Sequence, residues 1–434
     1  MELHISLVER RNIAAELYRQ LRQAIVDGRL LPGEALPPSR ELARRLRLSR
    51  TTVTTAYTRL TAEGMLTGRV GAGTFVSPRA SDTAPGARPG RRAGDRHTAL
   101  RARAVWDAVP LATPYATRAE FDFRSGLPDA AHFPHERWRR LLARATGADA
   151  VIGGVYGVPA GLPALREAIA RHIGVARAVA ATGDDVVVTS GMQQALDLVA
   201  RVLVAPGETV AMEDPGYGPA RRLFTSLGLR VHGVPVDEEG IVVREIPHRA
   251  RIVYVTPSHQ YPLGTVLSLS RRRELLAWSL EHGAAIVEDD YDSEFRFDGR
   301  PIEPLQTMDA AGHVIYVGTF SKTLLPTLRL GFLVAPPGIR EAIHRAKFVT
   351  DWHTSLLAQA TLAEFIATGL LARHIRRMQR IYGERRELIR TTVARDFPGR
   401  LTIVPSSAGL HVAAVAERAT AAEMTVVAER ALAA

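Results

Sequence analysis

The first quarter of the chain has apolar residues at helical spacing in three successive stretches. The spacing predicts a helix over Ile13–Asp27 and a second over Arg40–Leu46, and Ser49 can cap a third. The apolar face of the third helix consists of Val53, Ala56, Tyr57 and Leu60. A hairpin bounded by glycines follows over 65–76, so this order of elements predicts a winged helix-turn-helix domain over 1–78. A three-helix bundle with a solvated polar face is the alternative.

The polar face of the third predicted helix carries short polar and cationic side chains, namely Arg50, Thr51, Thr52 and Thr54. Such groups suit DNA phosphates and base edges. The charge is also uneven along the chain. The net charge is +11, and the stretch up to Thr117 alone has 19 arginines against 10 acidic residues. This asymmetry indicates a nucleic-acid partner at the N-terminal end.

Residues 79–119 differ in composition from the stretches on either side. They are rich in Arg, Ala, Pro and Gly, and no periodic apolar face occurs before Trp106. This composition predicts a basic, flexible linker between two domains. A solvated tether is the simpler interpretation, and non-specific contact with DNA phosphates is the alternative.

From residue 120 onward, short apolar runs alternate with helical stretches. The predicted strands are Asp185–Thr189, Thr209–Met212, Arg251–Thr256, Ala284–Glu288, Val314–Gly318 and Phe332–Ala335. This alternation predicts an α/β domain over 120–349 with a largely parallel sheet and with functional residues at the carboxyl ends of its strands. Long helices, two strands (the second over LHVAAV) and a last helix predict a small, shortened α+β domain over 350–434.

Composition limits the class of protein. A chain of 434 residues is too long for one ordinary core, so two or three domains are expected. No apolar run approaches the ~20 residues of a membrane helix, and the N-terminus has no apolar signal segment. The chain has no cysteine, which excludes disulfides and thiolate metal sites. We therefore expect a cytoplasmic protein without a membrane partner, and we predict no metal site.

The stretch 319–332, TFSKTLLPTLRLGF, follows a predicted buried strand and contains Lys322. Lys322 and Lys347 are the only lysines in the sequence. Arginine cannot lose its proton near neutral pH, whereas a desolvated lysine can, so chemistry that needs a neutral amine has two candidate side chains. Lys322 is the better candidate because Ser321 and Arg329 stand near it in sequence and suit a phosphorylated ligand. The combination is typical of a pyridoxal 5'-phosphate (PLP) site, and a surface lysine in a polar turn is the alternative.

Other candidate residues follow the predicted strands. Ser190 and Gly191 open a helix whose free amides suit a phosphate, and Tyr217 lies in a Gly-flanked loop where its ring can stack on a flat cofactor. Asp289 and Tyr291 emerge together from a buried strand, where a carboxylate needs a cationic partner such as a protonated pyridine nitrogen. Taken singly, a capped helix, a packed tyrosine and an aspartate bonded to backbone amides explain the same residues.

The stretch 28–76, GRLLPGEALPPSRELARRLRLSRTTVTTAYTRLTAEGMLTGRVGAGTFV, resembles the DNA-binding domain of the GntR family over nearly its whole length. The resemblance implies a double-stranded DNA operator as partner, with Arg40 on a backbone phosphate and Arg50 on a guanine edge. The other residues for which it implies phosphate, base or minor-groove contacts are Ser49, Thr51, Thr52, Arg69 and Gly71. Thr54 stands where some relatives have an arginine in the recognition helix, so their operator sequence does not carry over.

The order of the later motifs resembles the fold-type I aminotransferases, and their fusion to a GntR-type domain resembles the MocR subfamily of regulators. The resemblance implies PLP as cofactor, with Lys322 in the internal aldimine, Asp289 on the pyridine nitrogen and Tyr291 on the phenolate oxygen. The residues that it implies for the ring face and the phosphate are Tyr217 and then Gly191, Met192 (through its backbone), Ser321 and Arg329. Tyr261 of HQYPLG stands where many aminotransferases have an asparagine beside the phenolic oxygen. Because fold-type I proteins build each site at a dimer interface, the resemblance also implies a homodimer.

Two functions of different class fit these patterns. The first is a transcriptional regulator that senses PLP, or a small amino compound that reacts with it, without physiological turnover. The second is an active PLP-dependent aminotransferase with an incidental N-terminal domain. Relatives carry an arginine for the substrate α-carboxylate in strands beyond the last helix, and Arg418 and Arg430 lie before or within that helix. The sequence therefore favours the regulator, because transamination needs a firmly held substrate.

Overall fold

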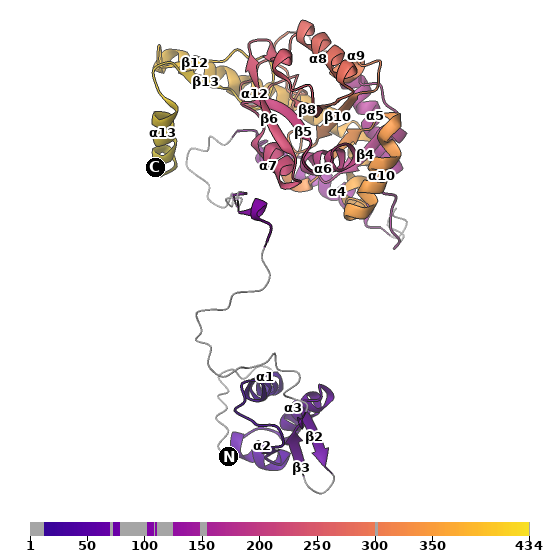
Figure 1. The fold of residues 1–434 in the computed structure, drawn as a ribbon, viewed down its shortest axis with the longest axis vertical. Coiled ribbons are helices and arrows are strands. Elements are labelled where there is room, and N and C mark those ends of the chain that lie inside the picture. Colours follow the sequence, from indigo (N-terminus) through magenta and orange to yellow (C-terminus); the bar gives the residue numbers. More distant parts are fainter. Residues whose placement is uncertain are drawn as a thin grey trace. The chain divides into compact units, whose positions relative to one another are not determined.

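The computed structural model describes residues 13–69, 73–78, 102–107, 109–110, 125–147, 154–299 and 303–433. The chain divides into two compact units, Met1–Arg101 and Ala102–Ala434 (Figure 1). Most of the predicted linker, 79–119, lies outside the described residues. Its described part contains one short 3-10 helix, η2 (Ala104–Trp106).

The N-terminal unit combines helices with a small sheet. Its described elements are α1 (Ile13–Val26), β1 (Ala35–Leu36), α2 (Ser39–Leu46), α3 (Arg50–Ala62), β2 (Leu66–Arg69) and β3 (Gly73–Val76). The strands form an antiparallel sheet in the order β1-β3-β2, so β2 and β3 make the predicted hairpin. The prediction of a winged helix-turn-helix is therefore confirmed.

A single apolar core holds these elements together. The predicted inner face of α3 is buried, and Val53 and Leu60 pack there with Leu17 of α1. At the N-terminal end of α3, the Ser49 side chain accepts a hydrogen bond from the Thr52 amide at 3.1 Å. This cap satisfies one of the free amides of the first turn and fixes the start of the helix as predicted.

The larger unit is built on a sheet of eight described strands. Along the chain these are β4 (Val186–Thr189), β5 (Thr209–Asp214), β6 (Arg230–Asp237), β7 (Gly240–Ile241), β8 (Ala250–Val255), β9 (Ala285–Asp290), β10 (Val314–Thr319) and β11 (Gly331–Val334). Their order in the sheet is β4-β11-β10-β9-β8-β5-β6-β7. The ladder from β10 through β9, β8 and β5 to β6 is parallel, whereas the β10–β11, β11–β4 and β6–β7 pairs are antiparallel.

Helices cover both faces of this sheet (Figure 1). The described helices are α4 (His135–Ala145), α5 (Pro163–Arg177), α6 (Met192–Leu203), α7 (Gly218–Ser226), α8 (Leu269–His282), α9 (Leu305–Met308), α10 (Pro337–Asp351), α11 (Leu356–Ala367), α12 (Leu370–Asp396) and α13 (Ala421–Ala433). The helices α6, α7 and α10 share a core with Val187 and Leu333. On the other face α5 and α11 pack with Val188 and Phe332, and α8 packs with Val253. Alternate strand residues therefore serve opposite cores, as expected of a buried α/β sheet.

All six strands predicted for the large domain are present in the sheet. The strands β6 and β7 are additional. Only Val234 of β6 is buried, because β6 lies near the sheet edge with the two-residue β7 as its outer neighbour. It therefore lacks the apolar run by which a central strand is recognised.

The long helix α12 leads to a separate two-stranded sheet of β12 (Leu401–Ile403) and β13 (Ala414–Ala416) (Figure 1). The predicted strand over LHVAAV is wrong for its first four residues, because β13 begins only at Ala414. The Leu410 amide donates a hydrogen bond to Asp292 Oδ2 at 3.0 Å, and His411 Nε2 lies 3.0 Å from the Pro262 carbonyl oxygen. This segment is therefore held by hydrogen bonds to loops of the large sheet, and not by pairing with a neighbouring strand.

Within the described ranges, none of the helices alone combines the length and the apolar character needed to cross a membrane. The helices α11 and α12 meet that requirement only as a pair, and this pair is bent by 76°.

Candidate functional site

Among the predicted DNA-contacting residues, Arg40 lies on α2, Ser49 caps α3, and the others described with side chains lie on α3. Those that are exposed to solvent are Arg40, Ser49, Arg50, Thr51 and Thr54, whereas Thr52 is half-buried. The Arg40 and Arg50 guanidinium groups form no ion pair or hydrogen bond with another described residue, so both can meet a phosphate or a base. The Thr54 hydroxyl already donates to the Arg50 carbonyl oxygen at 2.9 Å. Gly71 lies outside the described residues, and Arg69 is described only as the last residue of β2.

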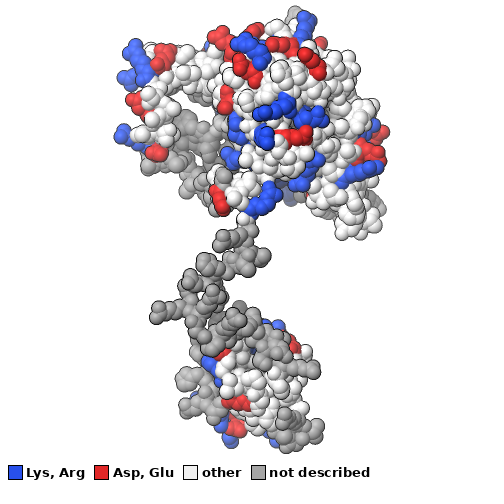
Figure 2. All heavy atoms as spheres, in the orientation of Figure 1, with Lys and Arg blue, Asp and Glu red and all other residues white. Residues whose placement is uncertain are grey.

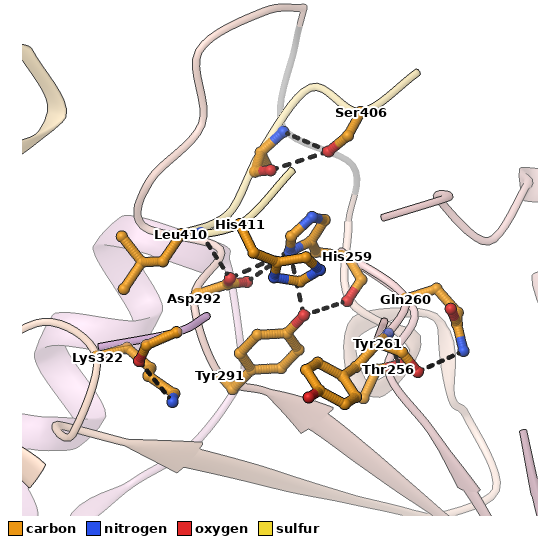
Figure 3. A network of polar contacts seen from close by, with 12 residues as sticks. Thr256, His259, Gln260, Tyr261, Tyr291, Asp292, Lys322, Ser406, Leu410 and His411 are labelled. Carbon is orange, nitrogen blue, oxygen red and sulfur yellow. Dashed lines mark hydrogen bonds and ion pairs between the residues drawn. The ribbon is translucent and has the colours of Figure 1, made fainter. Parts of the chain in front are cut away.

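Lys322 lies on the loop after β10, with its amine at the edge of a polar network (Figure 3). Its Nζ donates a hydrogen bond to the Gly126 carbonyl oxygen at 2.8 Å. A Cβ atom at position 126 would approach Nζ to 3.0 Å, so the glycine leaves room for the amine. Burial lowers the pKa of Lys322, and the smaller opposing effect comes from the charges of Asp292 and Asp289. The amine is therefore easier to deprotonate than that of an exposed lysine, as a nucleophile requires.

Asp289 lies near the end of β9, the strand next to β10, and is buried. Its Oδ2 accepts a hydrogen bond from the Tyr254 hydroxyl at 2.5 Å, whereas its Oδ1 has no partner among the described residues. Burial raises the pKa of Asp289 to about 8, and the Tyr254 hydrogen bond opposes that rise. A buried carboxylate oxygen without a partner is costly, and a protonated pyridine nitrogen would remove that cost. The arrangement at Asp289 therefore fits PLP.

A network of hydrogen bonds surrounds Tyr291 (Figure 3). The Tyr291 hydroxyl donates to the His259 carbonyl oxygen at 2.9 Å, and His259 Nδ1 lies 3.1 Å from Asp292 Oδ2. The His411 ring packs on the His259 ring with a centroid separation of 4.4 Å. Burial raises the pKa of Tyr291 well above its usual value and lowers that of His411 to about 4. Both side chains are therefore neutral at neutral pH, and the Tyr291 hydroxyl keeps its proton.

The predicted aromatic residues meet in one cluster beside this network. The Tyr217 ring packs edge to face on the Tyr261 ring with centroids 5.7 Å apart, and Tyr261 lies 6.4 Å from the Tyr291 ring. The Tyr261 amide donates to Thr256 Oγ1 at 3.0 Å, which fixes the loop that carries the ring. The structure thus brings together three tyrosines that follow three different strands.

Three of the predicted phosphate-binding residues, Gly191, Met192 and Arg329, meet at the start of α6. Arg329 Nη2 donates a hydrogen bond to the Ser190 carbonyl oxygen at 2.6 Å. A Cβ atom at Gly191 would approach that guanidinium group to 2.9 Å, and the φ of +83° at this position also requires glycine. Met192 is the first residue of α6, so its amide belongs to the unpaired N-terminal amides of the helix. These groups form a cradle suited to a phosphate. Ser321 is half-buried on the loop after β10, where its amide donates a hydrogen bond to Thr319 Oγ1 at 3.1 Å.

Several residues of the site are absent from the sequence predictions, namely Gly126, Tyr254, His259, Asp292 and His411. Tyr254 gives one usable signal, because a tyrosine in an otherwise aliphatic strand needs a hydrogen-bond partner for its hydroxyl. The identity of that partner follows only from the order of the strands. His411 gives no such signal, because it lies in the loop before β13, far in sequence from the strand ends at which the sequence predicts functional residues.

His259, Asp292 and His411 also have the geometry of a cation site. Each offers one ligand atom, and these atoms lie within 4.8 Å of one another. Hydrogen bonds already account for this arrangement, since His259 Nδ1 faces the Asp292 carboxylate and His411 Nε2 faces a carbonyl oxygen. We therefore interpret the cluster as a support for Tyr291.

The buried carboxyl groups predict how stability depends on pH. Burial raises the pKa of Asp289 to about 8 and that of Glu213 to about 7. The folded state therefore binds more protons than the unfolded state, and stability should fall as the pH rises toward 8. Asp289→Asn removes one of these groups, so the melting temperature of the cofactor-free variant should fall less than that of the wild type between about pH 5 and about pH 8. Each kcal/mol of stability difference corresponds to about 1–2 °C for a unit of this size. Thermal melts measure this, with exposed Glu281→Gln as control; equal slopes in all three proteins would contradict the prediction.

Two family models match the chain. The model described as aminotransferase class I and II matches residues 122–432, which include the sheet, Asp289 and Lys322. The model described as bacterial regulatory proteins of the gntR family matches residues 13–76, which include α1 to β3. Each model thus matches one of the two compact units.

Relatives and solved structures resemble the chain over most of its length. "Probable rhizopine catabolism regulatory protein MocR" from Rhizobium meliloti is 39% identical over 406 residues, which is 93% of this chain and 82% of the relative. "HTH-type pyridoxine biosynthesis transcriptional regulator PdxR" from Corynebacterium glutamicum is 31% identical, and the match covers 97% of this chain and 87% of the relative. The kynurenine aminotransferase of Pyrococcus horikoshii, solved in complex with PMP, has 30% identity and a TM-score of 0.65 over 70% of this chain and 77% of that chain.

The gntR match followed by the aminotransferase match gives a DNA-binding domain and then an aminotransferase-like domain. The aminotransferase class I and II fold is a PLP-dependent fold. The larger unit adds the amine, the buried carboxylate and the cradle at α6. The chain therefore belongs to the MocR type of GntR-family transcriptional regulators, in which a DNA-binding winged helix-turn-helix domain is joined to an aminotransferase-like domain.

Proposed function

We propose that this regulator binds PLP at Lys322 and senses either PLP itself or a small amino compound that reacts with it, as a cytoplasmic DNA-binding protein. The observation that carries the proposal is the pair of Lys322 and Asp289. Burial favours the neutral form of the Lys322 amine, and Asp289 Oδ1 is a buried oxygen without a described partner. A pyridine aldehyde needs an amine that loses its proton easily at one end. At the other end it needs a buried carboxyl group that becomes charged when a cationic pyridine nitrogen lies beside it.

In this proposal, five residues besides Lys322 each hold one part of the cofactor. Bound PLP supplies an electrophilic carbon that captures primary amines. Asp289 would hold the pyridine nitrogen, Tyr291 the phenolic oxygen, and Tyr217 the face of the ring. Arg329 and the amide of Met192 would hold the phosphate, because a guanidinium group and a helix N-terminus both favour a dianion.

A turnover assay distinguishes the regulator from the alternative function, an active aminotransferase. The MocR and PdxR relatives each match over more than 90% of this chain and are named as regulators, whereas the Pyrococcus horikoshii aminotransferase matches 70% of it. The gntR match also gives this chain a DNA-binding unit of its own. A survey of amino donors with a keto-acid acceptor should therefore show no sustained turnover. Keto-acid production at ordinary enzymatic rates of ~1–1000 per second would support the aminotransferase instead.

The sensing proposal is tested on DNA. Footprinting of the region upstream of the gene should show a protected operator whose protection changes when PLP, or PLP with a candidate amine, is added. Pyridoxine, which lacks the reactive aldehyde, is the control. Protection that is identical under all of these conditions would contradict a sensing role, while leaving DNA binding intact.

We further propose that the protein is a homodimer. An exposed apolar patch, defined as Val155, Tyr156, Phe348, Val349 and Trp352, lies where α10 meets the segment before α5. Tyr156 stacks on Trp352 with centroids 4.5 Å apart, and Val349 is 77% exposed. Contiguous exposed patches of this kind mark protein interfaces, and a second copy of the chain is the partner that the proposal commits to.

Introducing a charged side chain into the patch tests the proposed dimer interface. Val349→Glu should weaken association and shift the mass in light scattering toward the monomer, because an unpaired carboxylate would be buried at the interface. Leu388→Glu on α12 is the matched control, since Leu388 is 66% exposed and lies outside the patch. An unchanged mass in Val349→Glu, or the same shift in both variants, would rule out this interface.

A further inference from the structure

A cavity lies on the larger unit apart from the proposed PLP site, between α5, the loop after β9 and the start of α12. Its volume is about 600 Å³, which is in the range of small-molecule sites. Its lining does not include Lys322, Asp289, Arg329 or any other residue of the site described above. Part of the wall is apolar and includes Val175, Ile366 and Ile375.

Four arginines share this cavity, and they differ in their partners. Arg177 is already neutralised, because its Nε donates to Asp290 Oδ2 at 2.8 Å and both side chains are buried. Arg171, Arg296 and Arg376 form no ion pair or side-chain hydrogen bond with another described residue. The visible face of the larger unit in Figure 2 carries basic side chains both beside acidic ones and apart from them. What distinguishes Arg171, Arg296 and Arg376 is that they line one cavity, where a single acidic ligand could neutralise them together.

Two buried polar atoms in the same lining lack a partner. They are Arg296 Nε and Glu294 Oε2, and neither has a hydrogen-bond partner among the described residues. Leaving such groups unpaired costs free energy, so a ligand with hydrogen-bonding oxygens would stabilise the lining. Burial, followed by the negative charge of Asp290, raises the pKa of Glu294 to about 8. At neutral pH its carboxyl group is mostly protonated and can donate a hydrogen bond to an anion.

We propose that this cavity binds a small organic anion, a carboxylate or phosphate monoester on an apolar body, through Arg171, Arg296 and Arg376. The guanidinium groups would pair with the acidic group, since their fork of donors matches carboxylate and phosphate oxygens. The apolar wall would cover the body of the ligand. This site is separate from the PLP site, so it stands or falls independently of the proposed cofactor.

Isothermal titration of the full chain tests the proposal. The probes are benzoate and phenyl phosphate, with benzyl alcohol as the neutral probe of similar shape. Titrations are made with PLP present, so that a PLP-occupied cradle at α6 is closed to the probes. We expect saturable binding of at least one anionic probe and much weaker binding of benzyl alcohol. Binding of one anionic probe but not the other would identify the acidic group as carboxylate or phosphate.

Charge-reversal variants locate the binding. Arg376→Glu should weaken binding of the anionic probe at least about tenfold, because an attractive charge becomes a repulsive one. Arg380→Glu is the matched control, since Arg380 is exposed on the same helix one turn away and does not line the cavity. Arg171→Gln provides a second, milder variant on α5, and circular dichroism checks that each variant is folded. No saturable binding of either anionic probe, equal loss in Arg380→Glu, or equally tight binding of benzyl alcohol would overturn the proposal.

Discussion

Lys322→Ala should abolish covalent attachment of PLP to this protein. Lys322 is the amine that the structure places beside Asp289 and Gly126, and its pKa is lowered by burial. Wild-type protein mixed with PLP should develop the visible absorbance of a lysine-bound cofactor. After borohydride reduction, mass spectrometry should find the added mass on the peptide that contains Lys322. Both signals should be absent from the variant, because alanine offers no nucleophile.

The other lysine provides the matched control. Lys347 is also buried, but its Nζ is paired with the Asp351 carboxylate and lies 3.4 Å from Thr354 Oγ1. Burial lowers the pKa of Lys347 as well, and the hydrogen bond and charge of Asp351 oppose that shift. The two lysines differ in that a carboxylate directly occupies the Lys347 amine, whereas the Lys322 amine donates to a backbone carbonyl oxygen. Lys347→Met should therefore keep the absorbance band, even if breaking the pair lowers the melting temperature. Loss of the band in Lys347→Met and its survival in Lys322→Ala would reverse the assignment.

The sequence predicts those parts of the fold that depend on local patterns. The inner face of α3 follows from apolar spacing, and its cap follows from Ser49. The central strands follow from short aliphatic runs that are buried on both faces. The sequence also predicts that Lys322, Asp289 and Gly191 belong to one site, because residues at the carboxyl ends of strands in one sheet meet at one edge. In the structure these residues follow or end β10, β9 and β4 of the same sheet, and their shared role stays a prediction.

The support around these residues could not be predicted, because it joins parts of the chain that only the tertiary structure brings together. Tyr254 and Asp289 are 35 positions apart, and their hydrogen bond exists because β8 and β9 are neighbours. Asp292 and Leu410 are 118 positions apart, and their contact depends on the path of the loop before β13. A local pattern carries no information about either pair.

The lining of the cavity between α5 and α12 could not be predicted for the same reason. Arg171, Arg296 and Arg376 come from α5, a loop and α12, and in an arginine-rich sequence none of them stands out. Only the structure shows that these three lack a carboxylate partner among the described residues, whereas Arg177 beside them has one.

Arg50→Ala should weaken binding to the operator by ~1–3 kcal/mol and relax its sequence preference, if Arg50 reads a base edge. The structure favours this role because Arg50 begins α3, is exposed and has no described ion-pair partner. Binding to random DNA should change much less, since a base contact contributes little there. Gel-shift or anisotropy titrations on operator and random duplexes at the same salt concentration measure both affinities.

Arg40→Ala is the charge-matched comparison and should behave differently. Arg40 lies in the first turn of α2, where a contact with a backbone phosphate would contribute equally to every sequence. Its loss should weaken operator and random DNA alike, and should reduce the slope of log affinity against log salt by about one unit. Equal weakening of both DNAs by Arg50→Ala would remove its base-reading role. A change of sequence preference in Arg40→Ala, with its salt slope intact, would show instead that the two arginines exchange these roles.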